Sequence, residues 1–193
     1  KRKMASNIII SVQDKTAGAI TEPVTAQEVK DYLRLEGFTA VGGTELAYTD
    51  DDTLIGIIIK AVREKFEKIC GLTLTATRTK EAVITNQCGM IELPHGPVLE
   101  ITAALDEDGN DIESECTLVG NMWKHLKEPL YDNMVITYTA GYGTTGLELL
   151  PSEIKLDMLR SCAYYYMHRG DDPAVQTFIN TLANKYTRNV WLA

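Results

Sequence analysis

The order in which hydrophobic periodicity changes along this chain constrains its fold more than any other feature. Residues 25–35 and 51–70 carry apolar side chains at helical spacing, residues 72–139 alternate with a period of two, and residues 151–169 return to helical spacing. A parallel α/β sheet needs strands and helices that alternate along the chain. Because the expected strands are instead grouped in the middle, the sequence predicts an α+β fold. It has N-terminal helices, a central antiparallel sheet or small barrel, and C-terminal helices.

Local signals place the ends of the expected helices. Thr25-Ala-Gln-Glu28 is a capping box, in which the threonine hydroxyl caps the helix and the glutamate reaches back to the cap residue. Gly71 is a natural stop for the second helix. Pro151 opens a third helix, and Pro173 begins a last helical segment. The chain is therefore predicted to have an arm over residues 1–19, a main domain over residues 20–172, and a C-terminal helix and tail over residues 173–193.

The middle of the chain predicts short strands separated by polar breaks, preceded by an N-terminal strand or arm over Asn7–Gln13. Asp108-Gly109 lies between two apolar runs and is a strong hairpin signal, because glycine accepts the positive φ that a tight turn needs. The strands predicted here are Leu72–Ala76, Glu81–Thr85, Met90–Leu93, Val98–Leu105, Cys116–Val119, Met122–His125 and Met134–Tyr138.

A glycine motif after the last of these strands raises the question of a dinucleotide site. Gly141, Gly143 and Gly146 spell G-x-G-x-x-G. A dinucleotide turn needs a helix that begins within the motif and a second parallel strand bearing an acid about 20 residues on. Here the next helix signal is Pro151, and the residues after it have a helical pattern. The glycines are better explained by a chain that leaves a strand sharply, so no cofactor is predicted.

Composition and residue spacing exclude several other functions. The net charge is −8, and residues 1–150 hold 14 Lys/Arg against 23 Asp/Glu. An acidic body argues against binding nucleic acid through its phosphates, although it allows nucleic acid to pass without adhering. No stretch approaches the roughly 18 apolar residues that would span a membrane, so no membrane partner is predicted.

Metal and catalytic sites also lack support in the sequence. The four cysteines have no C-x-x-C spacing and are expected to be buried free thiols. The acidic run over residues 106–111 lacks the glycine and glutamate positions of a calcium loop, and a hairpin explains it better. The three histidines fall in different elements. No catalytic, cofactor-binding or metal-binding residue is therefore predicted.

Three stretches, in this order, resemble the head–tail connector proteins of tailed bacteriophages, also called adaptor or head-completion proteins. The first is Ile20-Thr-Glu-Pro-Val-Thr25 with the helix after it. The second runs from Asp51-Asp-Thr-Leu-Ile55 to Cys70-Gly71, with Glu67 at the family's glutamate position. The third is Val135-Ile-Thr-Tyr-Thr-Ala-Gly-Tyr-Gly143, followed by Leu150-Pro151 and the helix ending Tyr165-Tyr166-Met-His-Arg169.

The resemblance covers about residues 20–170 and implies a mechanical role in the virion at the head–tail interface. Copies of such proteins assemble, in the host cytoplasm, into a ring that is typically twelvefold. The ring lies beneath the portal protein, extends the DNA channel without sequence-specific binding, and offers a platform to the tail or stopper protein. No catalytic residues belong to this role. Another virion ring or tail-completion protein, or an enzyme with an unrecognised site, is the alternative.

A ring needs two different patches on each subunit that meet on rotation. The helix over residues 51–70 is apolar beyond one face, which fits either a well-buried helix or one that also meets a neighbouring subunit. The tyrosine-bearing helix over residues 151–169 is the second candidate. The expected interface residues are Ile55, Ile59, Phe66, Tyr164 and Tyr165, and the expected portal contacts in the C-terminal segment are Tyr186, Arg188 and Trp191. Acidic side chains are expected to outnumber basic ones on the channel wall.

Overall fold

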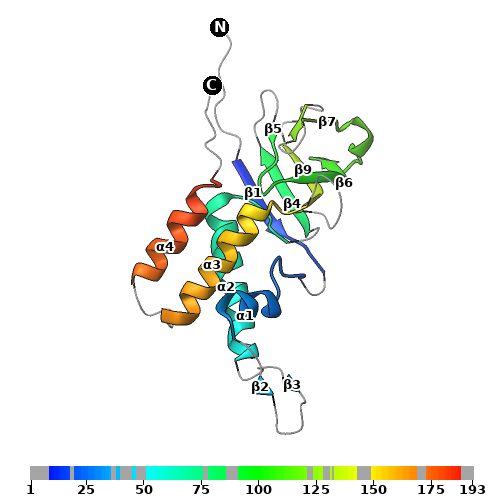
Figure 1. The fold of residues 1–193 in the computed structure, drawn as a ribbon. Helices are drawn as coiled ribbons and strands as arrows, with labels where there is room; N and C mark the ends of the chain where they lie inside the picture. Colours follow the sequence, from blue (N-terminus) through cyan, green and yellow to red (C-terminus); the bar gives the residue numbers. More distant parts are fainter. Residues whose placement is uncertain are drawn as a thin grey trace. The chain divides into compact units, whose positions relative to one another are not determined.

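A computed structural model describes most of the chain and has the predicted α+β fold (Figure 1). The described residues are 9–17, 20–35, 38–39, 45–46, 51–75, 78–85, 91–120, 124–127, 131, 133–142, 149–168 and 173–187. The chain divides into two compact units. Residues 1–21 and 72–149 form the sheet unit, and residues 22–71 and 150–193 form the helical unit. The sequence grouped residues 20–172 into one main domain, whereas contacts group the N-terminal strand with the sheet and the last helix with the earlier helices.

The sheet unit contains a four-stranded antiparallel sheet of order β1-β4-β9-β6 and a three-stranded sheet of order β5-β8-β7. β1 pairs with β4 along its whole length, from Ile9 opposite Thr85 to Asp14 opposite Lys80. The strands are β1 (Ile9–Asp14), β4 (Arg78–Thr85), β5 (Ile91–Glu92), β6 (Val98–Asp106), β7 (Leu118–Val119), β8 (His125–Leu126) and β9 (Asn133–Ala140).

The core of the sheet unit follows from the period-two pattern of β4 and β9. Alternate side chains of each strand are buried, including Ile84 on β4 and both Ile136 and Tyr138 on β9. Residues on one face of a strand recur every second position, so this alternation builds one apolar layer. The Tyr138 hydroxyl donates to the Pro94 carbonyl at 2.7 Å, and this bond satisfies the one polar atom of a buried ring.

Two predicted turns are present. Gly109 has a φ of +83°, and its N–H donates to the Asp106 carbonyl at 3.2 Å. One Asp106 carboxylate oxygen also accepts from the Asp108 and Asn110 amides at 2.9 and 2.8 Å, so the acidic run closes on itself as a tight turn. Gly141 has a φ of +126° directly after β9, which is the sharp exit expected from the glycine motif. Gly143 and Gly146 lie outside the described residues.

One predicted strand is wrong and one short hairpin is missed. Residues 72–75 of the expected strand Leu72–Ala76 make a single parallel bridge, from Leu72 to Gly96, instead of joining a ladder. All four of these side chains are buried, so both faces of the segment are covered. The alternation in its sequence therefore does not indicate one buried strand face. The missed hairpin pairs β2 (Phe38–Thr39) with β3 (Glu45–Leu46), between the first two predicted helices.

The helical unit packs four helices together, and Figure 1 shows them in blue, cyan, yellow-orange and red. The capping box is present as predicted. The Thr25 hydroxyl accepts from the Glu28 amide at 3.2 Å, and the Glu28 carboxylate accepts from the Thr25 amide at 2.9 Å. Gly71 ends the second helix in the left-handed conformation. The helices are α1 (Ala26–Leu33), α2 (Asp52–Cys70), α3 (Ser152–His168) and α4 (Pro173–Asn184).

Candidate functional site

The α2 residues expected at an interface between copies are core residues of this chain. Ile55 and Phe66 are 0% exposed, and Ile59 is 3% exposed. They therefore present no surface to a neighbouring copy, and their burial favours the first interpretation of this helix, a well-buried one. Ile57, on the same helix, is 62% exposed. A contact between copies through α2 remains a prediction, and it would have to use side chains such as Ile57.

The α3 tyrosines lie near the end of their helix and are half-buried. The Tyr164 ring stacks on Phe178 of α4, with 4.5 Å between ring centroids, and on His168, with 4.1 Å. Much of the Tyr164 ring area is thus used inside the helical unit. The Tyr166 hydroxyl donates to the Asp51 carboxylate at the start of α2. Tyr165 is half-buried as well, and its role between copies remains a prediction.

Two of the family-like stretches meet at a buried arginine. Arg63 on α2 is 2% exposed, and its guanidinium donates from Nε to Glu22 at 2.7 Å and from Nη1 to Glu67 at 2.8 Å. Burial alone would lower the pKa of Arg63, but the bonds to these two carboxylates outweigh it and raise the pKa. Glu67, the glutamate that the resemblance singles out, therefore holds a structural ion pair.

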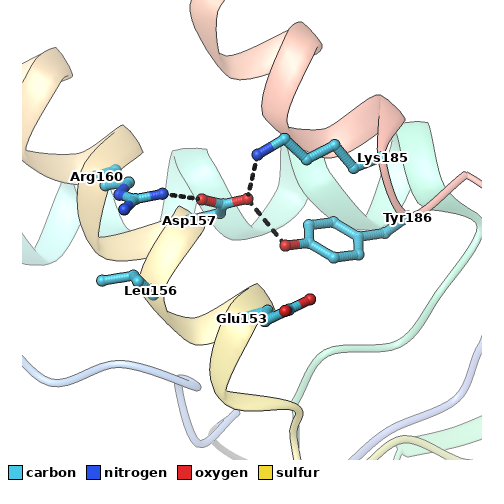
Figure 2. Close-up of a pocket in the computed structure, with 6 residues that line it drawn as sticks. All are labelled: Glu153, Leu156, Asp157, Arg160, Lys185 and Tyr186. Atoms are coloured by element: carbon cyan, nitrogen blue, oxygen red, sulfur yellow. Dashed lines mark hydrogen bonds and ion pairs between the residues drawn. The ribbon is translucent and has the colours of Figure 1, made fainter.

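A second polar cluster lies between α3 and the turn that follows α4 (Figure 2). Asp157 on α3 is 3% exposed. Its Oδ1 accepts from Arg160 Nη1 at 3.0 Å, and its Oδ2 accepts from Lys185 Nζ at 3.0 Å and from the Tyr186 hydroxyl at 2.8 Å. Three donors on one buried carboxylate give it a fixed position and a strong set of charge-assisted bonds.

The electrostatics of this cluster favour the charged carboxylate. Burial alone would raise the pKa of Asp157, but the hydrogen bonds from Lys185, Tyr186 and Arg160 outweigh it, so the pKa is lowered. Burial, together with the bond to Asp157, raises the pKa of Tyr186, which therefore stays a neutral donor. Asp157 is thus an ionised acceptor that these three side chains surround with donors.

Figure 2 shows that Glu153, Leu156 and Arg160 line the same hollow as Asp157, Lys185 and Tyr186. The hollow has a volume of about 370 Å³. Three of its four charged side chains are occupied with one another, since Asp157 binds both Arg160 and Lys185. Among the residues that the structure describes, no three His, Cys, Asp or Glu side chains gather as a metal site would require. The hollow therefore has the features of a structural joint more than of a catalytic site.

The free thiols also lack the features of a nucleophile. Cys70 and Cys162 are buried as expected, Cys116 is half-buried, and Cys88 lies outside the described residues. Burial raises the pKa of Cys70 and Cys116 to about 11 and that of Cys162 to about 12. A catalytic cysteine instead needs a lowered pKa, because the thiolate is the reactive form.

In the described part of the chain, moreover, no helix is both long and apolar enough for a membrane span.

Sequence reasoning identified part of the Asp157 cluster and missed its centre. Tyr186 is predicted as a portal contact, and its hydroxyl points inward to Asp157. Arg188 and Trp191, the other two expected contacts, lie outside the described residues. Asp157 itself carries a usable signal, because it lies three residues after Ile154 and four before Ser161, on the buried stripe of α3. An acid at a buried helical position needs partners.

Comparison with known proteins identifies solved chains that have the same fold. These chains belong to a gene transfer agent particle. One belongs to the virion of the native particle, with a TM-score of 0.67 and 21% identity over 94% of this chain and 98% of that one. Another belongs to the neck of the empty particle computed with C6 symmetry, with a TM-score of 0.67 and 20% identity. A third belongs to the neck of the native particle computed with C12 symmetry, with a TM-score of 0.64 and 20% identity. The matches to the two neck chains also cover 94% of this chain and 98% of the other.

No protein-family model matches this sequence, and no curated protein matches it either. At 20–21% identity the structural matches establish a shared fold. They extend over nearly the whole of both chains, so the arrangement of strands and helices described above is common to this protein and those particle chains.

Proposed function

We propose that this protein is a structural component of a virion neck, where copies of it form a ring between the portal and the tail of a tailed-phage particle. The observation that carries the proposal is the fold match to a neck chain over 94% of this chain and 98% of the other, in a neck computed with C12 symmetry. The three sequence stretches that resemble connector proteins support the same role independently, because the resemblance rests on residues and not on the fold.

The ring is proposed to guide DNA without binding it. Residues 72–149, which contain most of the sheet unit, hold 4 Lys/Arg and 12 Asp/Glu. Several of the acids are exposed in the turn after β6 and in the short 3-10 helix beyond it, including Glu107, Asp108, Asp111, Glu113 and Glu115. Negative side chains facing a channel repel phosphates and would keep a duplex mobile. We propose that this acidic end of the sheet unit lines the channel.

Contacts between copies are proposed to use the exposed apolar side chains of the helical unit. Ile57 on α2 and Met167 on α3 are each 62% exposed, and Tyr32 on α1 is 43% exposed. Apolar side chains left open on a subunit are natural candidates for burial against a neighbour. Tyr165 remains in this proposed set, while Ile55, Ile59 and Phe66 support the interface from beneath. The C-terminal segment is proposed to contact the portal.

The mass of the assembled complex tests this function. The full chain is mixed with the isolated portal oligomer of the same particle, and the mass of the products is measured by mass photometry, with the chain alone as control. The proposal expects portal oligomers that carry a full ring of copies, whether or not the chain assembles alone. Portal oligomers that gain no mass at saturating chain concentration would refute it.

An enzyme with an unrecognised site would behave differently in the same measurement. It would remain a monomer or small oligomer with or without the portal, and it would hold a small molecule in a polar pocket. Three of the four charged side chains that line the hollow beside Asp157 already bind one another, so the hollow does not favour that alternative.

A further inference from the structure

We propose that copies of this chain meet through two exposed helix stripes: α2 of one copy packs antiparallel on α3 of the next, with Lys60 facing Glu153 and Ile57 facing Leu156. This inference rests on the proposed function, because it concerns the contact between copies in the proposed ring. What is added is the partner of each stripe, its orientation and its register.

The stripe on α3 combines an unpaired acid with an open apolar side chain (Figure 2). Glu153 lines the hollow beside Asp157, where the other three charged side chains bind one another. Glu153 is exposed, and it makes no ion pair or hydrogen bond with another described residue. Leu156 lines the same hollow and is 40% exposed. The acid and the leucine are three residues apart, so they lie on one face of α3.

The stripe on α2 is complementary to it. Ile57 is 62% exposed, and Lys60, three residues later, is exposed and has no ion-pair partner among the described residues. Gly56 and Ala61 are exposed beside them, and a Cβ added at Gly56 would meet no atom within 4 Å. This stripe therefore has an apolar side chain and a cation at the spacing of the apolar side chain and the acid on α3, and its small residues let a second helix approach.

The two stripes must belong to different copies in order to meet. Within the chain α2 and α3 pack against each other through their buried sides. A stripe that is exposed to solvent lies away from that contact, so the α2 stripe cannot face the α3 stripe of its own chain. Two different patches that pair between copies form a heterologous contact, which is the kind of contact that a ring needs.

The spacing of the side chains sets the orientation and the register. In an antiparallel pair, placing Ile57 opposite Leu156 also places Lys60 opposite Glu153, because both steps are three residues long. In a parallel pair, Lys60 would lie on the side of Leu156 away from Glu153. An antiparallel pair shifted by one turn toward the end of α2 would place Glu64 opposite Glu153, and facing like charges repel. The opposite shift would lose both matched pairs.

The two matched pairs contribute in different ways. Burying Ile57 against Leu156 removes apolar surface from water and so stabilises the contact. An ion pair near the surface adds little stability by itself, but it selects the partner and the register. Reversing one of the two charges creates a like-charge pair, which disfavours the contact. The charges therefore give the sharpest test of which residues meet.

Charge reversal in two separate chains tests the pairing. Chains carrying Lys60→Glu or Glu153→Lys are added to the isolated portal oligomer, first separately and then as an equal mixture, and the bound mass is measured by mass photometry. Each variant alone should load about tenfold more weakly than the unsubstituted chain, because every contact in its ring would join like charges. The mixture should restore a full ring, because copies that alternate bring opposite charges together at every contact.

The matched control is Lys68→Glu. It makes the same charge change at another exposed position of α2, which in the proposed register lies beyond the first residue of α3, so it should load as well as the unsubstituted chain. Single variants that load normally would overturn the inference. Single variants that the mixture does not rescue would overturn it as well, since Lys60 and Glu153 would then meet another protein. Rescue by the mixture also shows that both variants fold.

Cross-linking tests the register directly. The exposed residues Ala61 and Ser152 face each other when Lys60 faces Glu153. Chains carrying Ala61→Cys or Ser152→Cys are mixed and treated with a short thiol-to-thiol cross-linker, both with and without the portal oligomer. The mixture should give covalent dimers in at least one condition, and either chain alone, with the same native cysteines, should give no more than the unsubstituted chain. No dimers from the mixture in either condition would overturn the inference.

The two measurements separate the failure of this inference from the failure of the proposed function. If the cysteine mixture gives dimers but portal oligomers gain no mass with any chain, attachment to the portal is wrong and the contact between copies stands. If portal oligomers carry a full ring of each single charge variant, the inference is wrong and the ring at the portal stands.

Discussion

At the scale of single residues, the helical unit depends on charges that are buried and paired. Arg63 is 2% exposed and is among the largest fully buried side chains of the described residues. Taking a guanidinium out of water is costly unless carboxylates and hydrogen bonds replace the solvent. Glu22 and Glu67 supply both, and they tie the segment before α1 to the last turns of α2.

Removing this arginine should destabilise the protein strongly. Arg63→Met keeps the length of the side chain but leaves Glu22 and Glu67 without their partner, so we expect a loss of about 3 kcal/mol in the free energy of unfolding. Glu64→Gln is the matched control, because Glu64 is exposed and lies 3.5 Å from the same guanidinium; its cost should stay within about 0.5 kcal/mol. Urea denaturation of the three proteins measures this. Equal stability of the two variants would contradict the account.

The contribution of Asp157 to stability should depend on pH in a defined direction. The pKa of Asp157 is lowered in the folded protein, so its contribution is fully present above the unfolded carboxyl pKa of about 4 and is lost as the pH falls through the folded value. Unfolding free energies of the unsubstituted protein and Asp157→Asn should thus differ by about 1–3 kcal/mol at pH 7 and converge as the pH is lowered below 4. A difference that grows on acidification would contradict this assignment.

At the scale of elements, local sequence signals predicted where the helices begin and end, but they did not predict which strands pair. The four helices lie within two residues of their expected bounds, because caps such as Thr25 and Gly71 act within a few residues of themselves. The sequence predicts a strand or arm over Asn7–Gln13 without identifying its partner, and β1 pairs with β4, more than 60 residues along the chain. Periodicity identifies the face of a strand and says nothing about its partner, so the strand order could not be predicted.

The capping box of α1 provides a test at this scale. Thr25→Ala removes the side-chain acceptor of the Glu28 amide and should lower the unfolding free energy by about 1 kcal/mol. Thr25→Ser keeps a hydroxyl in the same place and should cost much less. Thermal unfolding followed by circular dichroism would compare them, and an alanine variant as stable as the serine variant would contradict a role for the cap.

Attachment of β1 to the sheet should depend on Asp14. Its carboxylate accepts from Lys80 Nζ at 2.9 Å, from the Thr16 amide at 3.0 Å, and from Arg78. From Ser11 to Asp14 no β1 side chain is fully buried, so this charged cluster supports the attachment together with the backbone ladder to β4. Asp14→Asn should increase the hydrogen-exchange rate of the β1 amides about tenfold, which corresponds to roughly 1.4 kcal/mol. Glu81→Gln removes only the surface pair with Lys15 and should leave the exchange unchanged.

At the scale of the whole molecule, the chain passes three times between a sheet unit and a helical unit, at residues 21–22, 71–72 and 149–150. The sequence predicted the fold class because helical and strand periods differ, but it could not decide what covers an apolar helix. Ile55, Ile59 and Phe66 have the same pattern whether the chain itself or a neighbour buries them, and here the chain does. The Asp157 cluster could not be predicted either. Its partners Lys185 and Tyr186 lie 28 and 29 residues further along the chain, and residue spacing alone does not identify such pairs.

The charge of the channel wall is a further prediction at this scale. The acidic turn after β6 is expected to face the channel, so acids should outnumber bases on that wall. Replacing Glu107, Asp108 and Glu113 with lysine should slow DNA passage through the neck, because basic side chains hold phosphates. The rate of DNA ejection from particles carrying the variant ring measures this, and faster ejection would contradict the prediction.

We propose that copies of this chain join edge to edge around a hole. Electron cryomicroscopy of the virion that incorporates the chain would show this arrangement. We expect a closed ring of copies at the neck, with twelve as the expected number, and a channel running through its middle. Isolated subunits elsewhere in the particle, or subunits gathered around an occupied chemical pocket, would contradict it.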